Sequence, residues 1–263
     1  MKTAIIIPAR YGSTRFPGKP LTMIAGKTML TRVVEIAQKV AKKLPDITVA
    51  VATEDERILK HAENDIDVKC VMTSDNCATG SDRVLEALEK LDGDFDFVLG
   101  LQGDAPFTPI DAPIKMIEAF QNNNNINVVT PVMNLRWEEL DKLREQKKTT
   151  PFSGTTAILN KEGQALWFSK NILPAIRKEN LADAYSPVYQ HVGLYGYRVD
   201  VLKQFVSLPQ GHYEQLEGLE QLRLLENNIS VQTVTIEVDP GLAQAGIDSP
   251  EDVERAEKIL ANL

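Results

Sequence analysis

The stretch TAIIIP (residues 3–8) begins an alternation of apolar, β-branched runs and helical patterns that decides the fold. It is followed by the helical pattern MLTRVVEIAQKVAKK (29–43) and by a second β-branched run, ITVAVAT (47–53). Strands buried on both faces read as continuous apolar runs, and a helix is the usual crossover between parallel strands. The pattern therefore predicts a doubly wound, mainly parallel α/β sheet. Further strand patterns of the same kind are VKCVMT (68–73), FVLGLQGD (97–104) and VVTPVM (128–133).

The alternation weakens after about Arg136, which bears on domain organisation. Strand patterns recur in TTPFSGTTAILN and VYQHVGLYGYR, but the stretch between them is irregular. We interpret the chain as one domain, 1–263, in which 147–209 is an inserted arm. The expected closing elements are a helix in LEGLEQLRLLEN (216–227), a strand in SVQTVTIEV (230–238) and a last helix from about Pro250.

Composition excludes several classes of protein. The chain has 263 residues, enough to bury a core without disulfides, and its only cysteines, Cys70 and Cys77, indicate free structural thiols. A net charge of −8 argues against a nucleic-acid partner, which cationic side chains would have to neutralise. The first apolar run is too short for a signal peptide or a membrane span, so we expect a cytoplasmic protein without a membrane partner.

The first predicted strand runs into a basic loop, PARYGSTRFPGKP (8–20), that matches neither common phosphate-binding fingerprint. It lacks G-x-G-x-x-G, and Pro20 stands where a Walker loop has its Ser or Thr. Ligands bind at the carboxyl ends of the strands in such sheets, and arginine binds phosphate oxygens in pairs. Arg10, Arg15 and Lys19 therefore indicate a phosphate-binding loop, with a solvated basic loop as the alternative.

Two aspartates stand where a magnesium ion could bind beside phosphates. Asp104 follows a predicted strand in LQGDAP, and Asp248 precedes the last predicted helix in GIDSPED. Two carboxylates at one edge of the sheet could hold Mg²⁺ on a triphosphate. The alternative for Asp248 is a role in capping that helix, where Ser249 is the expected N-cap.

Other acidic and histidine residues fit a site less well. Asp94 and Asp96 resemble a metal motif of glycosyltransferases, but they precede their strand and so belong to the opposite edge of the sheet. His61, His191 and His212 are too dispersed for a metal cluster. His191, in a predicted strand with two tyrosines, could equally be a hydrogen-bonded core residue.

Together these motifs resemble the sugar-acid cytidylyltransferases, and among them the enzymes that make CMP-Kdo from CTP and 3-deoxy-D-manno-octulosonate (Kdo). The resemblance covers nearly the whole chain. It implies a Rossmann-like, GT-A-like nucleotidyltransferase, a homodimer joined through the inserted arm, and a product used for lipopolysaccharide synthesis. The motifs that carry it, in the order of the family, are IIIPARYGSTRFPGKPL, VMTSDNCATGSDR, LQGDAP, ALWFSK, HVGLYGYR, LEGLEQLR and GIDSPEDVERA.

The resemblance also implies roles for individual residues. The residues that would carry catalysis are Arg10, Arg15, Lys19, Asp104 and Asp248, the two aspartates as ligands of Mg²⁺. The residues that would bind CTP are Pro8, Ala9, Arg10, Ser13, Arg15, Lys19, Gly80, Ser81 and Arg83. The residues that would face the sugar acid are Gln102, Arg177, His191, Tyr195, Glu220 and Gln221.

The chain departs from the family pattern mostly on the sugar-facing side. Ala105 stands in place of Glu, and Ala175 stands in place of an aromatic residue. Lys170 and Gln190 each stand in place of Arg. Thr156 lies in a strand that usually reads Val-Lys-Val-Val. An altered octulosonate such as the 8-amino form, or a nonulosonate-like acid, is therefore an alternative substrate. Two other functions stay open, a nucleotide-sugar pyrophosphorylase acting on a sugar phosphate and a catalytically silent nucleotide-binding protein.

Overall fold

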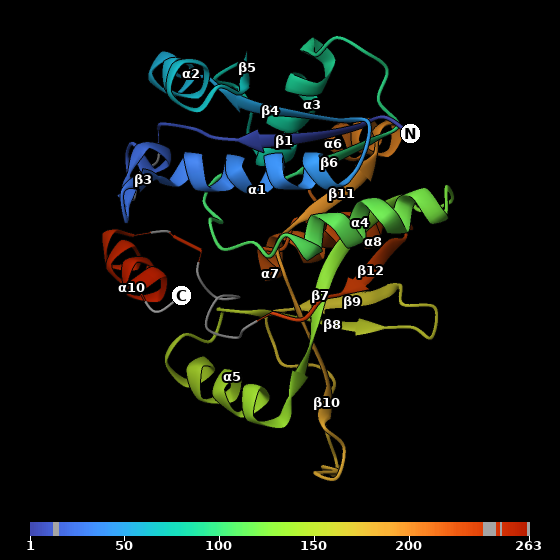
Figure 1. The fold of residues 1–263 in the computed structure, drawn as a ribbon. Coiled ribbons are helices and arrows are strands. Elements are labelled where there is room, and N and C mark those ends of the chain that lie inside the picture. Colours follow the sequence, from blue (N-terminus) through green and yellow to red (C-terminus); the bar gives the residue numbers. More distant parts are fainter. Residues whose placement is uncertain (13–15, 239–245, 248, 262–263) are drawn as a thin grey trace.

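The computed structural model describes residues 1–12, 16–238, 246–247 and 249–261. Within these ranges ten strands form one mixed sheet in the order β5-β4-β1-β6-β11-β7-β10-β8-β9, with β12 also paired to β7 (Figure 1). The strands are β1 (Thr3–Pro8), β4 (Ile47–Thr53), β5 (Lys69–Met72), β6 (Phe97–Gly100), β7 (Val128–Arg136), β8 (Thr155–Leu159), β9 (Ala165–Ser169), β10 (Tyr185–His191), β11 (Tyr195–Arg198) and β12 (Val231–Thr235). A separate small ribbon consists of β2 (Met23–Ile24) and β3 (Lys27–Thr28).

Helices cover both faces of the sheet, as the sequence pattern predicted. They are α1 (Met29–Lys43), α2 (Glu56–His61), α3 (Gly80–Lys90), α4 (Asp111–Asn122), α5 (Trp137–Thr149), α6 (Val199–Ser207), α7 (His212–Glu217), α8 (Leu222–Glu226) and α10 (Pro250–Ala261). None of the helices in the described ranges is long and apolar enough to cross a membrane.

The sheet has a parallel half and a largely antiparallel half. Strands β5, β4, β1 and β6 are parallel neighbours, and β12 runs parallel to β7. Strand β11 lies between β6 and β7 and is antiparallel to both, and β10, β8 and β9 continue the antiparallel pairing. The predicted doubly wound α/β class is confirmed, and its parallel half brings the ends of β1, β4, β5 and β6 to one edge.

Strand β1 shows why a continuous apolar run is needed in the middle of the sheet. Ala4 and Ile6 face a core shared with α3 and α6, whereas Ile5 and Ile7 face a second core shared with α1 and α4. All four side chains are fully buried. Burying an isoleucine side chain stabilises the fold by about 2–3 kcal/mol, so both faces of this strand contribute.

The region 147–209 is joined to the central sheet through its strands. The two predicted strand stretches form β8, β10 and β11, and ALWFS adds β9, which the sequence reading did not assign. Helix α5 packs on β10 through a small core containing Leu140, Leu143 and Val188. The role of this region as a dimerisation arm stays a prediction.

The prediction of a single helix over residues 216–227 is wrong. Gly218 has φ 63°, in the left-handed region, and ends α7 at Glu217. The chain resumes a helix only at Leu222. A glycine adopts this conformation without steric cost, so the apolar periodicity on both sides of it belongs to two short helices rather than one.

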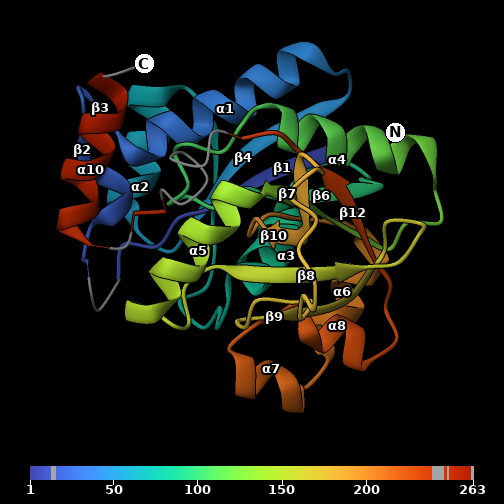
Figure 2. The same ribbon diagram turned by 90° about the horizontal axis from the view of Figure 1, so that it is seen from below.

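The last predicted helix is confirmed and packs against the β2–β3 ribbon (Figure 2). Ile24, Met29, Ile247 and Ala256 form a small core there. The Asp252 carboxylate accepts hydrogen bonds from the backbone N–H and the hydroxyl of Ser249 at the start of α10. This contact stabilises the amino end of α10.

Candidate active site

A cavity of about 380 Å³ lies where three parallel strands end. It is lined by the residues after β1 (8–10), the loop before α3 (77–80) and the loop after β6 (102–104), together with Lys19, Pro20 and Arg83. We call it the strand-end cavity. Its position confirms the expectation that the loops following β1, β5 and β6 meet at one edge of the sheet.

Lys19 and Asp104 form an ion pair at one side of the strand-end cavity. Lys19 Nζ lies 2.7 Å from Asp104 Oδ2, and the side chains are 16% and 40% exposed. Lys19 belongs to a short 3₁₀ turn, Lys19–Leu21, which begins after Gly18 in a left-handed conformation. The basic loop and the acidic loop therefore converge, as expected from their positions at the ends of β1 and β6.

Gly103 allows the loop after β6 to approach β1 closely. A Cβ atom at this position would lie 2.7 Å from the Pro8 carbonyl oxygen, closer than such atoms approach. Any larger residue would push Asp104 and Gln102 away from the end of β1. The glycine thus sets the distance between the basic loop and Asp104.

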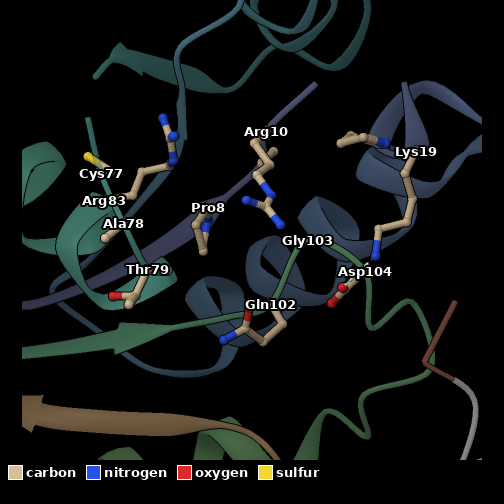
Figure 3. A pocket seen from close by; sticks show the side chains of 13 residues that line it. Pro8, Arg10, Lys19, Cys77, Ala78, Thr79, Arg83, Gln102, Gly103 and Asp104 are labelled. Carbon is tan, nitrogen blue, oxygen red and sulfur yellow. Dashed lines mark hydrogen bonds and ion pairs between the residues drawn. The ribbon is translucent and has the colours of Figure 1, made fainter. Parts of the chain in front are cut away.

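Two arginines of the strand-end cavity differ in their surroundings. The exposed Arg10 side chain lies between the wall formed by Cys77, Ala78 and Thr79 and the wall formed by Lys19 and Asp104 (Figure 3). Arg10 is therefore placed to meet an anion. Arg83, in contrast, is buried, pairs with Glu54 Oε2 at 2.9 Å and donates to the Thr73 hydroxyl.

Glu54 was missed by the sequence reading, although it follows β4 at the same edge of the sheet. Its Oε1 accepts a hydrogen bond of 2.9 Å from the Tyr11 N–H, and its Oε2 pairs with Arg83. One carboxylate thereby joins the basic loop to α3. The signal available in the sequence was its position immediately after a predicted strand.

The amino end of α3 forms another wall of the strand-end cavity. The Thr79 side chain accepts from the Asp82 N–H, and the Asp82 side chain accepts from the Thr79 N–H, which is a capping box. Gly80, the first residue of the helix, lines the cavity. Ser81 does not line it and instead donates to Glu220 Oε2 at 3.4 Å. Helix amino ends attract negative or carbonyl groups, so this wall can bind part of a polar ligand.

Cys77 also lines the strand-end cavity and was not assigned a role from the sequence. Its thiol donates to Glu86 Oε2 at 3.1 Å. Burial, followed by that hydrogen bond, raises the pKa of the Cys77 thiol to about 11. The thiol is therefore neutral at pH 7 and is a poor nucleophile.

A second cavity of about 380 Å³ is lined by His191, Tyr195, Gln190, Gln221 and residues 153–155. We call it the neutral cavity, because none of the described residues that line it is charged. A smaller cavity of about 160 Å³ lies between the two: it shares Gln102 with the strand-end cavity and Gly193 with the neutral cavity. The three cavities therefore border one another along the loops that contain Gln102 and Gly193.

Burial changes the titration of several groups around the neutral cavity. Loss of hydration, and then the nearby Lys170 ammonium, lower the pKa of His191 to about 3, and its Nε2 lies 2.8 Å from the Thr130 hydroxyl. Burial likewise raises the pKa of the Tyr195 hydroxyl and of the Glu220 carboxyl above their ordinary values. His191 and Tyr195 therefore act as neutral hydrogen-bonding groups at pH 7.

Two buried polar atoms, one of them on a residue that lines this cavity, have no hydrogen-bond partner among the described residues. They are Glu220 Oε1 and Gln221 Nε2. Buried polar groups are nearly always paired, so such atoms indicate a missing ligand or water. One is an acceptor when ionised and the other is a donor, which together suit the hydroxyl groups of a sugar.

Three of the expected site residues are not described by the structure, and Arg177 is described but lines neither cavity. Ser13, Arg15 and Asp248 lie outside the described residues. Arg177 is exposed and lines neither cavity, so its expected contact with the sugar acid stays a prediction without support from position.

Two hydrogen bonds locate Ile247, which precedes Asp248, and Asp96. Ile247, the residue before Asp248, donates its N–H to the Asp104 carbonyl oxygen at 3.2 Å. Asp96 accepts from the Lys2 N–H at 2.8 Å near the start of β6, which confirms that this acidic pair lies away from the strand-end cavity. In the described part of the chain there is no group of three or more His, Cys, Asp or Glu side chains that could hold a metal.

Comparison with known proteins agrees with this geometry. The cytidylyltransferase family model matches residues 4–235. The 3-deoxy-manno-octulosonate cytidylyltransferase of Maricaulis maris is 42% identical, over 99% of this chain and 98% of the relative. That of Bacteroides thetaiotaomicron is 40% identical, over 100% and 99%.

A solved structure supports the same assignment at the level of the fold. It is a CMP:2-keto-3-deoxy-manno-octonic acid synthetase complexed with CTP, with a TM-score of 0.85 and 32% identity, covering 100% of this chain and 99% of its own. The sequence and fold comparisons thus coincide over the whole length. The chain belongs to the 3-deoxy-manno-octulosonate cytidylyltransferase family and is a nucleotidyltransferase.

Proposed function

We propose that this cytidylyltransferase transfers CMP from CTP to Kdo or a close relative of Kdo, releasing pyrophosphate. The observation that carries the proposal is the pair of neighbouring cavities, one with charged groups for a triphosphate and one with neutral hydrogen-bonding groups for a sugar. The anomeric oxygen of the sugar acid forms a bond to the α-phosphorus. The bond from that phosphorus to the bridging oxygen breaks, pyrophosphate leaves with the electron pair, and the hydroxyl proton is lost to solvent.

The strand-end cavity supports binding of the CTP phosphates by side chains as well as backbone. Arg10 and Lys19 supply positive charge on the loop after β1, and Gly80 presents the amino end of α3. Phosphoryl transfer depends mainly on positioning and on neutralising charge in the transition state. We expect Arg15 and Ser13, on the same loop, to contribute in the same way.

Magnesium fits the acidic side of this cavity. Asp104 lines it with a partly exposed carboxylate, the hard oxygen ligand that Mg²⁺ prefers. The backbone hydrogen bond between Ile247 and Asp104 supports a role for Asp248 as the second carboxylate. A bound Mg²⁺ would neutralise charge on the triphosphate. Lys19, now paired with Asp104, would then be available to a phosphate oxygen.

The neutral cavity supports a polyhydroxylated acid as the acceptor. Gln190 and Gln221 place amide groups there, and the unpaired Nε2 of Gln221 can donate to a sugar hydroxyl. His191 and Tyr195 add neutral ring groups. We assign no side chain as general base, because the groups placed nearest the sugar have pKa values shifted away from pH 7.

One observation favours a modified sugar as a second candidate. Gln190 is a buried neutral residue at a position where the family pattern has arginine. Loss of that positive charge removes a repulsion toward an ammonium group on the substrate, which suits 8-amino-Kdo. The two sugars therefore have to be compared directly.

We also propose that 147–209 contributes to contact between two copies of the chain. Phe152 and Leu181 expose 77% and 71% of their surface, and Tyr185 exposes 39%. Large exposed apolar side chains often mark interfaces between proteins. Light scattering coupled to size-exclusion chromatography tests this directly, and a monomeric mass at micromolar concentration contradicts it.

The decisive experiment is an assay of pyrophosphate release with Mg²⁺ and each of the four nucleoside triphosphates. Each is combined with Kdo, with 8-amino-Kdo or with a sugar phosphate. We expect release with CTP and one of the two acids, and the ratio of kcat/KM values decides between them. Release with UTP and a sugar phosphate, or no release with CTP and either acid, contradicts the proposal.

A further inference from the structure

Lys147 forms an unusual set of contacts just outside the neutral cavity. Its Nζ donates to the carbonyl oxygens of Ser153 (2.5 Å), Gly154 (2.9 Å) and Lys170 (2.5 Å), with Pro151 farther away at 3.3 Å. An ammonium has three N–H donors and therefore matches three close carbonyl groups. Lys147 is thus surrounded by backbone acceptors rather than by a carboxylate.

These carbonyl groups come from two separate segments. Residues 151–154 form the loop between α5 and β8, whereas Lys170 follows β9. Neighbouring Glu217, at the end of α7, accepts from the Ser169 hydroxyl and from the Lys170 N–H, both at 2.8 Å. Lys147 therefore ties the loop to the end of β9, which is itself held by α7.

The loop held by Lys147 is part of the wall of the neutral cavity. Ser153, Gly154 and Thr155 line that cavity, whereas the Lys147 ammonium lies behind them. Gly154 has φ 65°, and a Cβ atom there would lie 3.0 Å from Leu143 Cδ1. The conformation of the loop is therefore specific: Thr150 and Ser153 are hydrogen-bonded to each other at its turn, and Lys147 binds the carbonyl groups of Ser153 and Gly154.

Loss of the ammonium would leave three partly buried carbonyl groups, those of Ser153, Gly154 and Lys170, without this partner. Unpaired buried polar groups are costly, so the loop would turn toward water rather than keep its present conformation. Burial, followed by the Lys170 charge, lowers the pKa of the Lys147 ammonium, which shows that this group is partly removed from water. A carbon side chain of similar length cannot replace these hydrogen bonds.

We propose that Lys147 is a positioning residue for the sugar acid, because it fixes the loop wall 153–155 of the neutral cavity without touching the substrate. The proposal rests on the function proposed above for that cavity. A shift of the wall by about 1 Å is enough to lower the rate by up to about 100-fold. The nucleotide side, built on other loops, is not affected.

The matched test compares Lys147→Met with Lys148→Met. Lys148 is the adjacent, largely exposed residue and pairs only with Glu145 on the surface of α5 among its described contacts. We expect Lys147→Met to raise the KM for the sugar acid by about 10- to 100-fold and the KM for CTP by less than about twofold. Lys148→Met should change neither constant by more than about twofold.

A second pair of variants covers the case in which Lys147→Met does not fold. Lys147→Arg keeps the charge, but its planar guanidinium does not match three carbonyl groups arranged around an ammonium. We expect it to raise the KM for the sugar acid at least threefold, whereas Lys148→Arg has no effect. Equal KM values for Lys147→Arg and Lys148→Arg overturn the proposal.

Hydrogen exchange separates this inference from the proposed function. The amides of residues 150–155 should exchange faster in Lys147→Met or Lys147→Arg than in the wild type, whatever the substrate is. Unchanged exchange overturns the inference even if the enzyme is active with Kdo. A further outcome is a wild type that is inactive with both sugar acids while the two Lys147 variants still exchange faster than it does. That result supports the contact between Lys147 and the loop and overturns the function proposed for the cavity.

Discussion

The two cavities of this protein are built in opposite ways. The strand-end cavity lies where β1, β5 and β6 end at the same edge of the sheet, and it has charged residues such as Arg10, Lys19 and Asp104. The neutral cavity is lined from β10, β11 and the loop before β8, in the antiparallel half of the sheet, and has no charged residue in its described lining. A triphosphate needs charge neutralisation, whereas a sugar needs hydroxyl partners, so each half of the sheet suits one part of the reaction.

Removing the carboxylate of the strand-end cavity should have the largest effect. We expect Asp104→Asn to lower kcat by on the order of 10³-fold, because an amide cannot replace a carboxylate as a ligand for Mg²⁺. Pyrophosphate release at saturating CTP measures this, with circular dichroism to verify the fold. Asp94→Asn, an exposed aspartate before β6, is the control.

Asp248→Asn should cause a comparable loss if Asp248 is the second ligand of the metal. Activity within about tenfold of the wild type in both Asp104→Asn and Asp248→Asn would remove the metal assignment.

The second largest effect is expected from loss of Lys19, the cation that pairs with Asp104. We expect Lys19→Met to lower kcat/KM for CTP by about 100-fold, because a positive charge near the phosphates is lost from a partly buried position. The KM for the sugar acid should stay within about twofold, since the neutral cavity is built from other segments. Lys27→Met, which removes an exposed cation of the β2–β3 ribbon, serves as the comparison.

The KM values of Lys19→Met test whether the two cavities act independently. An equal rise in the KM for CTP and for the sugar acid would show that the cavities are energetically coupled rather than separate.

The third test concerns β11, the strand that joins the parallel half of the sheet to the antiparallel half. A Cβ atom at Gly196 of β11 would lie 2.1 Å from Phe97 Cζ, and the buried Phe97 ring stacks on Phe120. We expect Gly196→Ala to lower the free energy of unfolding by about 1–3 kcal/mol in a urea titration. Gly193→Ala is the control for stability, because a Cβ atom there meets nothing within 4 Å. Equal stability of the two variants would mean that Gly196 of β11 is not tightly packed against Phe97.

The smallest expected effect concerns pH and the neutral cavity. The pKa of His191 is lowered to about 3 in the folded protein, whereas it is about 6.5 in the unfolded chain. Between pH 6.5 and pH 3, therefore, only the unfolded state takes up the proton. The His191 contribution to stability is therefore intact above pH 6.5 and declines as the pH falls from 6.5 toward 3.

Urea unfolding at pH 7 and pH 5 measures this contribution. Between these values the wild type should lose about 1–2 kcal/mol more of its unfolding free energy than His191→Gln does. His212→Gln, at an exposed position, should behave as the wild type. The same pH dependence in His191→Gln and in the wild type would contradict a neutral, buried histidine.

The strand-end cavity could be predicted well from the sequence. Lys19 and Asp104 each follow a clear strand pattern, and the rule that parallel strands end at one edge brings them together. Glu54 could have been found by the same rule. Asp94 and Asp96 were excluded correctly, because they precede a strand rather than follow it.

The neutral cavity could not be assembled in this way. Its walls come from antiparallel strands and from loops whose ends are not fixed by a common edge, so sequence position does not indicate which residues meet. The contacts of Lys147 depend on carbonyl groups, which every residue has, and leave no signal in side-chain type. The helix expected over 216–227 failed at Gly218, where one glycine could equally have been tolerated within a helix.

The sequence by itself determined the alternation of buried strands and helices, the parallel half of the sheet and the basic and acidic loops at its edge. These follow from hydrophobic periodicity and from local chain direction, which are properties of short segments. Tertiary packing alone places β11 between β6 and β7, sets a small cavity that borders the strand-end cavity at Gln102 and the neutral cavity at Gly193, and brings Lys147 to the loop that lines the neutral cavity. Long-range pairing and burial set these features, because they depend on which distant segments exclude water together.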